Sequence, residues 1–224
     1  ISALAVRFIR RMPSLRSAMV RSHAFGASIM PADESSGLVE RLRRGDERAF
    51  AEFVRRYQLP VFNVVFRILG HRREDALDVS QEVFVTVFRS IGSFRGESKL
   101  STWVHRIAVN HCRSRLKYLG RRREGQHDPL DEGQGEGTYA GVPLRGEVPG
   151  PEAVYQGTEA ERFIRLALGE LDAGQREVVV LRDIEGLAYE EIVEITGLSL
   201  GTVKSRLFRA REALEAAYRR FRND

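Results

Sequence analysis

Cysteine, long apolar runs and groups of metal ligands are all scarce in this sequence, and each absence excludes a class of protein. Cys112 is the only cysteine in 224 residues, so no intramolecular disulfide can form and no pair of thiols can hold zinc. No apolar stretch approaches the roughly 20 residues that a membrane-spanning helix needs. We expect a cytoplasmic protein without direct membrane insertion, without a metal and without another cofactor.

Lysine is nearly absent, and arginine supplies almost all of the positive charge. Lys99, Lys117 and Lys204 are the only lysines, whereas Lys plus Arg total 36 against 31 acidic residues, a formal net charge of +5. The planar guanidinium suits phosphates and base edges, although a GC-rich genome would produce the same bias. The charge balance therefore permits nucleic-acid binding without establishing it.

Breaker residues divide the chain into four parts. Residues 1–36 contain several arginines and are expected to form a mobile basic extension outside the fold. Residues 37–119 and 158–224 have the apolar spacing of helices. Residues 120–157 are acidic and rich in Gly and Pro, and too few apolar anchors are present to offset the entropy of ordering them. The predicted fold is all-α, with two small helical domains joined by a flexible linker and without a fixed mutual orientation in the free chain.

Three helices are expected in the first domain. Asp46 is expected to cap the first, which continues past Pro60 and ends at Gly70. The second, over residues 74–91, turns one apolar stripe inward, and a basic helix over residues 99–118 follows a loop. The stripe consists of Ala76, Ser80, Val83, Phe84, Val87, Phe88 and Ile91.

The pattern of residues 188–211 predicts a helix-turn-helix. Gly197 falls where the short turn needs a left-handed residue. Five residues are expected to pack the two helices together: Ile192, Val193, Leu198, Val203 and Leu207. The outer part of the second helix is expected to carry Thr202, Lys204, Ser205, Phe208, Arg209 and Arg211. Basic residues at helical spacing alone would favour a solvated helical hairpin, but the turn glycine, the packing register and the basic face together favour insertion into a DNA major groove.

Two sets of motifs resemble one known family. Residues 181–192 (LRDIEGLAYEEI) and 201–214 (GTVKSRLFRAREAL) are similar to region 4 of the extracytoplasmic-function (ECF) sigma factors, the RpoE-like group IV of the primary-sigma-related family. Residues 45–50, 78–84 and 93–96, with Thr102-Trp103 and residues 106–110, are similar to the family's region 2. Two matching domains in the expected order make the resemblance specific.

The resemblance implies a transcription initiation factor and not an enzyme. Such a protein binds RNA polymerase core and directs promoter recognition, melting and initiation, as a stress- or signal-responsive alternative sigma factor. An anti-sigma factor is a further expected partner. Contact with the coiled coil of the largest polymerase subunit is assigned to Asp78, Gln81 and Glu82, which without the resemblance would be read as a solvated acidic face.

The resemblance also implies two DNA-reading surfaces. Residues expected at the minus-thirty-five element are Arg182, Thr202, Lys204, Ser205, Phe208 and Arg209. Residues expected at the minus-ten element and its phosphates are Phe94, Arg95, Asn110, Arg113 and Lys117. Trp103 is expected in the core rather than on DNA, and Phe208 is equally suited to capping the domain core.

Two alternatives of other classes remain open from the residues alone. A stand-alone helix-turn-helix regulator would bind duplex DNA without polymerase. An enzyme would need a nucleotide loop, a metal cluster or a nucleophile beside a base, and the sequence shows none of these signatures.

Overall fold

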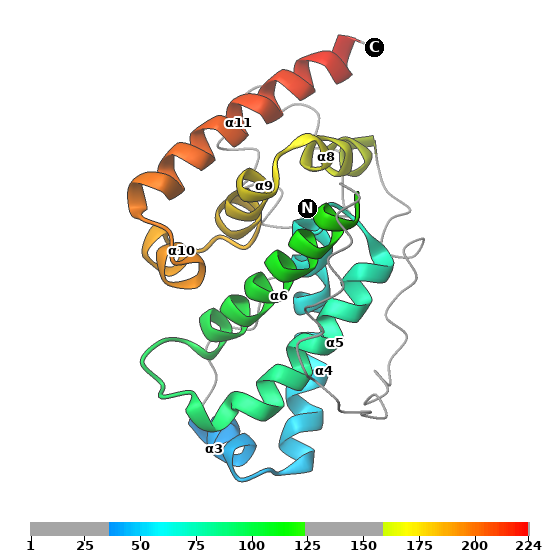
Figure 1. The fold of residues 1–224 in the computed structure, drawn as a ribbon. Coiled ribbons are helices and arrows are strands. Elements are labelled where there is room, and N and C mark those ends of the chain that lie inside the picture. Colours follow the sequence, from blue (N-terminus) through cyan, green and yellow to red (C-terminus); the bar gives the residue numbers. More distant parts are fainter. Residues whose placement is uncertain (1–35, 124–158, 224) are drawn as a thin grey trace.

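The computed structural model describes residues 36–123 and 159–223, which form two helical bundles (Figure 1). The N-terminal bundle consists of α3 (Ser36–Arg43), α4 (Glu47–Ile68), α5 (Arg73–Ser90), the short 3₁₀ helix η2 (Ile91–Ser93) and α6 (Leu100–Arg123). The C-terminal bundle consists of α8 (Glu159–Glu170), α9 (Ala173–Val179), the π-helical turn η3 (Val180–Ile184), α10 (Tyr189–Thr196) and α11 (Leu200–Asn223). The described residues contain helices and no strand, which confirms the all-α prediction.

The basic N-terminal extension and most of the flexible acidic linker lie outside the described residues. The exception is the segment 120–123, assigned to the linker from its sequence, which continues α6 as helix.

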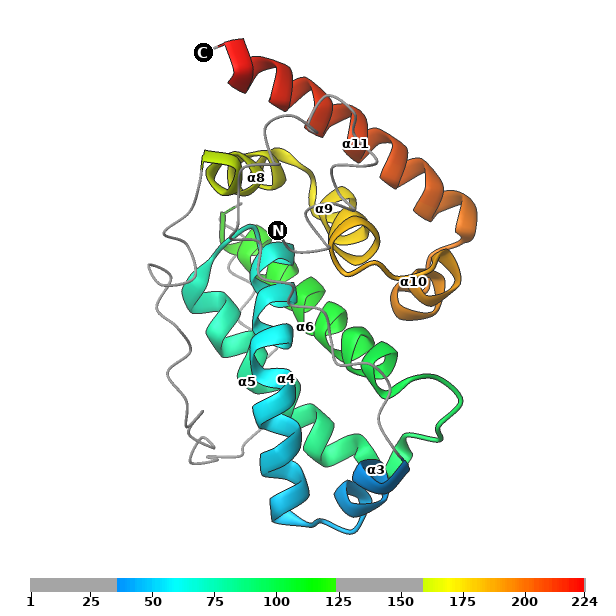
Figure 2. The same cartoon turned by 180° about the vertical axis from the view of Figure 1, so that it is seen from behind.

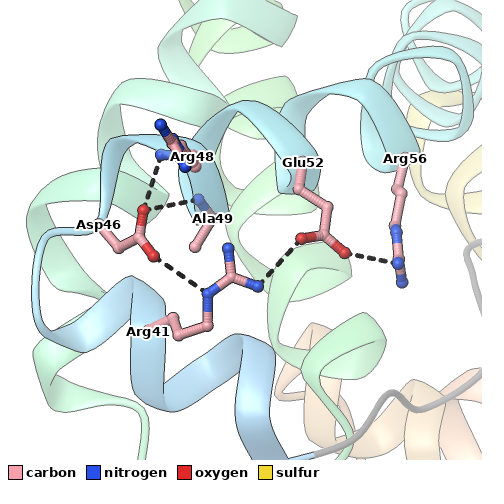
Figure 3. A network of polar contacts seen from close by, with 6 residues as sticks. All are labelled: Arg41, Asp46, Arg48, Ala49, Glu52 and Arg56. Atoms are coloured by element: carbon pink, nitrogen blue, oxygen red, sulfur yellow. Dashed lines mark hydrogen bonds and ion pairs between the residues drawn. The ribbon is translucent and has the colours of Figure 1, made fainter.

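The predicted cap of α4 is confirmed (Figure 3). The Asp46 carboxylate accepts hydrogen bonds from the backbone N–H groups of Arg48 and Ala49, at 2.8 and 3.2 Å. These donors have no partner within the helix, so the cap satisfies them. Arg41 of α3 bridges Asp46 at 3.0 Å and Glu52 at 3.2 Å, and thereby fixes α3 against the start of α4. The hydrogen bond from Arg41 and the backbone donors lower the pKa of Asp46.

The apolar stripe of α5 faces the core with one exception. Ala76, Val83 and Val87 are fully buried, but Phe88 is 56% exposed. The prediction that Phe88 faces inward was wrong. Its ring packs edge-on against Phe50 at the margin of the bundle, with 5.0 Å between ring centroids, so the aromatic covers α4 while one side stays exposed to solvent.

The second half of α4 is buried on every side. All residues from Val61 to Leu69 are buried, including Asn63 and Arg67. A helix that is apolar around its whole circumference needs neighbours on more than one side. Helices α5 and α6 cover one side, and α9 with η3 of the C-terminal bundle covers another. The helix runs through Pro60 and ends as predicted, with Gly70 at φ +69°.

In the C-terminal bundle, the sequence predicts one continuous helix over residues 173–184, and this prediction was wrong. At Val180 the α-helix passes into a π-helical turn, in which the Glu185 N–H donates to the Val180 carbonyl at 2.9 Å. The wider turn changes the direction of the side chains that follow. Asp183 and Glu185 are consequently buried at contacts with other helices.

The two bundles pack directly against each other. Helix α10 lies beside α6 in both views (Figures 1 and 2), and α9 with η3 contacts α4. Helix α11 lies on the side of the C-terminal bundle away from α3 and α5 (Figure 2). This contact was not predicted from the sequence, which indicated two halves without a fixed mutual orientation.

Candidate nucleic-acid interface

The helix-turn-helix is built by α10, a short turn and α11. The Glu191 carboxylate accepts the Ala188 N–H at 2.8 Å and so closes the first turn of α10. Gly197 ends α10 at φ +68°, as predicted. Ser199 caps the start of α11, because its hydroxyl oxygen accepts the Thr202 N–H at 3.2 Å. These local contacts set the direction in which α11 leaves the turn.

The predicted packing register of the helix-turn-helix is confirmed. Ile192, Val203 and Leu207 are buried between the helices, and Val193 and Leu198 pack at the edge of the same core. With these positions facing inward, the intervening residues of α11 are directed outward.

The outer face of α11 carries most of the residues assigned to the minus-thirty-five element. Lys204, Ser205, Phe208 and Arg209 are exposed, and Thr202 is half-buried. Phe208 is 63% exposed, so it does not cap the domain core. Three hydrogen-bonding side chains and one accessible aromatic ring therefore share one helix face, a combination suited to phosphates and base edges.

Two arginines of this domain point inward. Arg182 lies with its guanidinium 4.4 Å from the centre of the Tyr189 ring and donates to the Leu187 carbonyl. Arg211 forms two hydrogen bonds to the buried Asp183 carboxylate, at 3.0 and 2.6 Å. The prediction that Arg211 belongs to the outer face was wrong, because a carboxylate 28 residues earlier in the chain draws its side chain toward η3.

In the N-terminal bundle, three of the residues assigned to the minus-ten element are exposed: Arg95, Asn110 and Lys117. Phe94 is only 6% exposed and packs against Trp103, with 5.4 Å between ring centroids. Trp103 is itself half-buried against the core, as expected. The loop after α5 is thus anchored by its aromatic side chain and presents its polar residues outward.

Arg113, the fifth residue of this set, is engaged by the other bundle. Its Nε and Nη2 donate to the two carboxylate oxygens of Glu177, at 2.9 and 2.7 Å. Its Nη1 donates to the Thr196 carbonyl at 2.9 Å. A residue assigned to DNA phosphates is therefore bound to the C-terminal bundle in this structure.

The residues assigned to polymerase contact share one exposed face of α5. Asp78, Gln81 and Glu82 are all exposed. Arg115 of α6 lies 3.3 Å from Asp78 and 3.7 Å from Glu82. His111 donates to Glu82 at 3.1 Å, and this hydrogen bond lowers the pKa of the Glu82 carboxyl. Two basic side chains of α6 therefore hold the acidic face of α5 in place.

A group of buried polar residues between the bundles was missed from the sequence. Arg176 donates to the Ile68 carbonyl at 2.8 Å, and Arg67 lies 3.5 Å from Glu185. His105 lies 3.9 Å from the same carboxylate. The sequence carried one signal of this contact. The second half of α4 is apolar around the helix except for Asn63 and Arg67, and such a helix needs a packing partner on a second side.

The described residues contain no group of three or more potential metal ligands. Cys112 is buried, and burial raises the pKa of its thiol, which makes it a core residue rather than a reactive one. None of the helices within residues 36–123 and 159–223 is long and apolar enough to cross a bilayer.

Comparison with known proteins identifies both bundles. Residues 53–122 match the family model for Sigma-70 region 2, and residues 164–214 match that for Sigma-70 region 4. The chain is 43% identical over 178 residues to the ECF RNA polymerase sigma-E factor of Haemophilus influenzae, covering 80% of this chain and 92% of that protein. It is 35% identical over 189 residues to the RNA polymerase sigma-H factor of Pseudomonas aeruginosa, covering 84% and 96%.

Two solved structures resemble the chain. CnrH in complex with the cytosolic domain of CnrY is 26% identical, with a TM-score of 0.54, covering 80% of this chain and 94% of that one. The sigma factor RpoE from Bartonella quintana, in complex with the anti-sigma factor NepR, has a TM-score of 0.56 over 77% of this chain and 98% of that one. At 23% identity this second structure supports the fold alone.

With two family regions in order and close relatives along most of its length, the chain belongs to the ECF sigma factors of the sigma-70 family, non-enzymatic proteins that direct RNA polymerase to promoters.

Proposed function

We propose that the two bundles read the two promoter elements separately. The outer face of α11 binds the minus-thirty-five duplex through Lys204, Ser205, Phe208 and Arg209, with Thr202 at its edge. The observation that carries this proposal is the exposure of these side chains on a helix whose opposite face is packed into a helix-turn-helix. Arg182 reaches the same duplex only after leaving the Tyr189 ring.

The loop after α5 and the outer face of α6 bind the melted minus-ten strand. Asn110 hydrogen-bonds to an exposed base edge, and Arg95, Arg113 and Lys117 bind phosphates. Phe94 supports this loop from the side of the core, because its packing on Trp103 holds the loop in position. Base contacts give sequence preference, whereas phosphate contacts give salt-sensitive affinity.

The acidic face of α5 binds the polymerase. Asp78, Gln81 and Glu82 dock on the coiled coil of the largest subunit in the cytoplasm, where polymerase works. An anti-sigma factor controls the chain in response to stress or another signal. The name of one structural relative, which was solved with the anti-sigma factor NepR, supports such a partner. The predicted domains 37–119 and 158–224 each bind one promoter element, and residues 120–157 are the linker between them.

Transcription in vitro, with polymerase core in the presence and absence of the chain, tests this function. Initiation at specific promoters that core alone ignores is the expected result. Tight binding of the isolated chain to operator duplex without any association with core would instead support a stand-alone regulator.

A matched pair of variants separates specificity from affinity. Arg209→Ala is expected to relax base preference at the minus-thirty-five element and to cost about 1–3 kcal/mol if the contact is bidentate. Arg122→Ala, at an exposed position of α6 near Tyr118, is expected to weaken all promoters alike. Equal effects of both changes across a promoter library would refute the assignment.

A further inference from the structure

The contact between the bundles occupies the guanidinium of Arg113, which the proposed function assigns to a DNA phosphate. Arg113 has five N–H donors, and three of its nitrogens bind the C-terminal bundle: two bind the Glu177 carboxylate and one binds the Thr196 carbonyl. The Glu177 side chain is only 5% exposed, so this carboxylate is enclosed at the interface.

A carboxylate and a phosphate offer an arginine the same recognition geometry. Each presents two oxygens to the parallel N–H groups of the guanidinium fork, and each carries negative charge. The Nε and Nη2 groups of Arg113 cannot hold a backbone phosphate while both donate to Glu177. In the arrangement of this structure, Glu177 takes both of the N–H groups that would otherwise be open to a phosphate.

The remaining interface is built to hold the bundles together. The Arg176 guanidinium donates to the Ile68 carbonyl at the end of α4, and to the Leu168 and Leu171 carbonyls at the end of α8. It thereby caps the carbonyl ends of two helices from different bundles, where helix dipoles favour a positive charge. Gly70 permits this approach, because a Cβ there would lie 3.3 Å from the guanidinium.

The buried apolar surface supports the same arrangement. Phe62 and Phe66 lie on the half of α4 that is buried on every side and contacts α9 and η3. Separation of the bundles exposes part of this surface to water, which costs free energy in proportion to the apolar area uncovered. The docked arrangement is therefore favoured by hydrogen bonds and by burial together.

We propose that the C-terminal bundle inhibits the N-terminal bundle of the same chain, with the Glu177 carboxylate acting as an internal substitute for a promoter phosphate on Arg113. The inhibition is selective. It blocks the contact between α6 and the melted strand, while the outer face of α11 remains exposed for the minus-thirty-five duplex. This inference rests on the proposed role of Arg113 in DNA binding.

The test uses the whole 224-residue chain with one fluorophore on each bundle, attached through Arg55→Cys on α4 and Arg219→Cys on α11. Both positions are exposed, and the native Cys112 is buried. Energy transfer reports the separation of the bundles. A short single-stranded DNA of mixed sequence serves as the probe, because a phosphate contact does not depend on base identity.

Glu177→Gln is expected to lengthen the mean distance between the fluorophores and to tighten single-strand binding by at least about fivefold, since the charge-assisted pair is lost. The matched control is Glu170→Gln. It removes the same charge from an exposed pair with Arg220, 2.5 Å long and contained within the C-terminal bundle. The control is expected to change neither quantity, and identical behaviour of the two variants overturns the proposal.

Arg176→Met provides an independent route to the same result, because it weakens the interface without touching Arg113 or Glu177. The variant is expected to separate the bundles and to tighten single-strand binding, with duplex binding by α11 retained as the sign of an intact C-terminal bundle. Separation without tighter single-strand binding overturns the proposal.

Transcription by holoenzyme carrying Arg113→Ala distinguishes this inference from the function on which it rests. Normal transcription by that variant would show that Arg113 is not a DNA contact, and both statements would fail. Impaired transcription, combined with unchanged single-strand binding by the Glu177→Gln chain, would refute the proposed inhibition and leave the proposed function standing.

Discussion

The pair formed by Arg211 and Asp183 decides how firmly α11 is held, and its removal gives a measurable loss of stability. The Asp183 side chain is 2% exposed and the Arg211 side chain 28% exposed, with N–O distances of 2.6 and 3.0 Å. Arg211→Met keeps the apolar stem but leaves the buried carboxylate without the two hydrogen bonds from the guanidinium. The hydrogen bonds that Arg211 donates to Asp183 also raise the pKa of Arg211, consistent with a favourable contact.

The expected cost follows from this geometry. Removal of one partner from a fully buried pair costs about 3–5 kcal/mol. Because water reaches Arg211, we expect the lower end, about 3 kcal/mol, in the free energy of unfolding measured by urea denaturation with far-UV circular dichroism. The loss falls on the attachment of α11 to η3, so use of the minus-thirty-five element is expected to decline as well.

The same replacement elsewhere on α11 serves as the control. Arg220→Met breaks the pair with Glu170, whose two side chains are 63% and 58% exposed. Exposed pairs contribute at most about 1 kcal/mol, so this variant is expected to remain close to the parent. If Arg211→Met costs no more than Arg220→Met, the reasoning that Asp183 anchors the recognition helix is refuted.

Two further predictions concern backbone conformation and pH. Gly197→Ala is expected to cost about 1 kcal/mol, because φ is +68° although the space around the position is open. Gly169→Ala, inside α8 and equally open, is expected instead to stabilise by about 0.5–1 kcal/mol; equal signs in denaturation would contradict the argument. Burial, followed by the charges of Arg67, Arg165 and Arg176, lowers the pKa of His71 to about 3. As pH falls below about 6.5, the unfolded chain therefore takes up a proton at His71 while the folded chain does not. Between pH 7 and 5, the free energy of unfolding of the parent is expected to fall by about 2 kcal/mol more than that of His71→Asn. Asparagine is the chosen replacement because it tolerates the left-handed backbone at this position. Identical pH profiles of the two chains would show that His71 titrates normally.

The sequence by itself determined the local structure of this protein. Asp46 caps α4 and Gly197 ends α10 because both effects depend on a few neighbouring backbone groups. The buried positions of the helix-turn-helix followed from periodicity, since residues three or four apart share a helix face. Family motifs, which are local as well, were enough to identify both regions.

Only the tertiary structure decided which partner each charged side chain has. An arginine on a helix surface looks the same in sequence whether it faces DNA, as Arg209 is free to do, or binds a buried carboxylate, as Arg211 does. The π-helical turn at Val180 sets where Asp183 and Glu185 point, and no periodicity announced it. Arg113 and Glu177 lie 64 residues apart. Their contact depends on how two finished bundles dock, and docking is set by the complementarity of whole surfaces rather than by spacing along the chain.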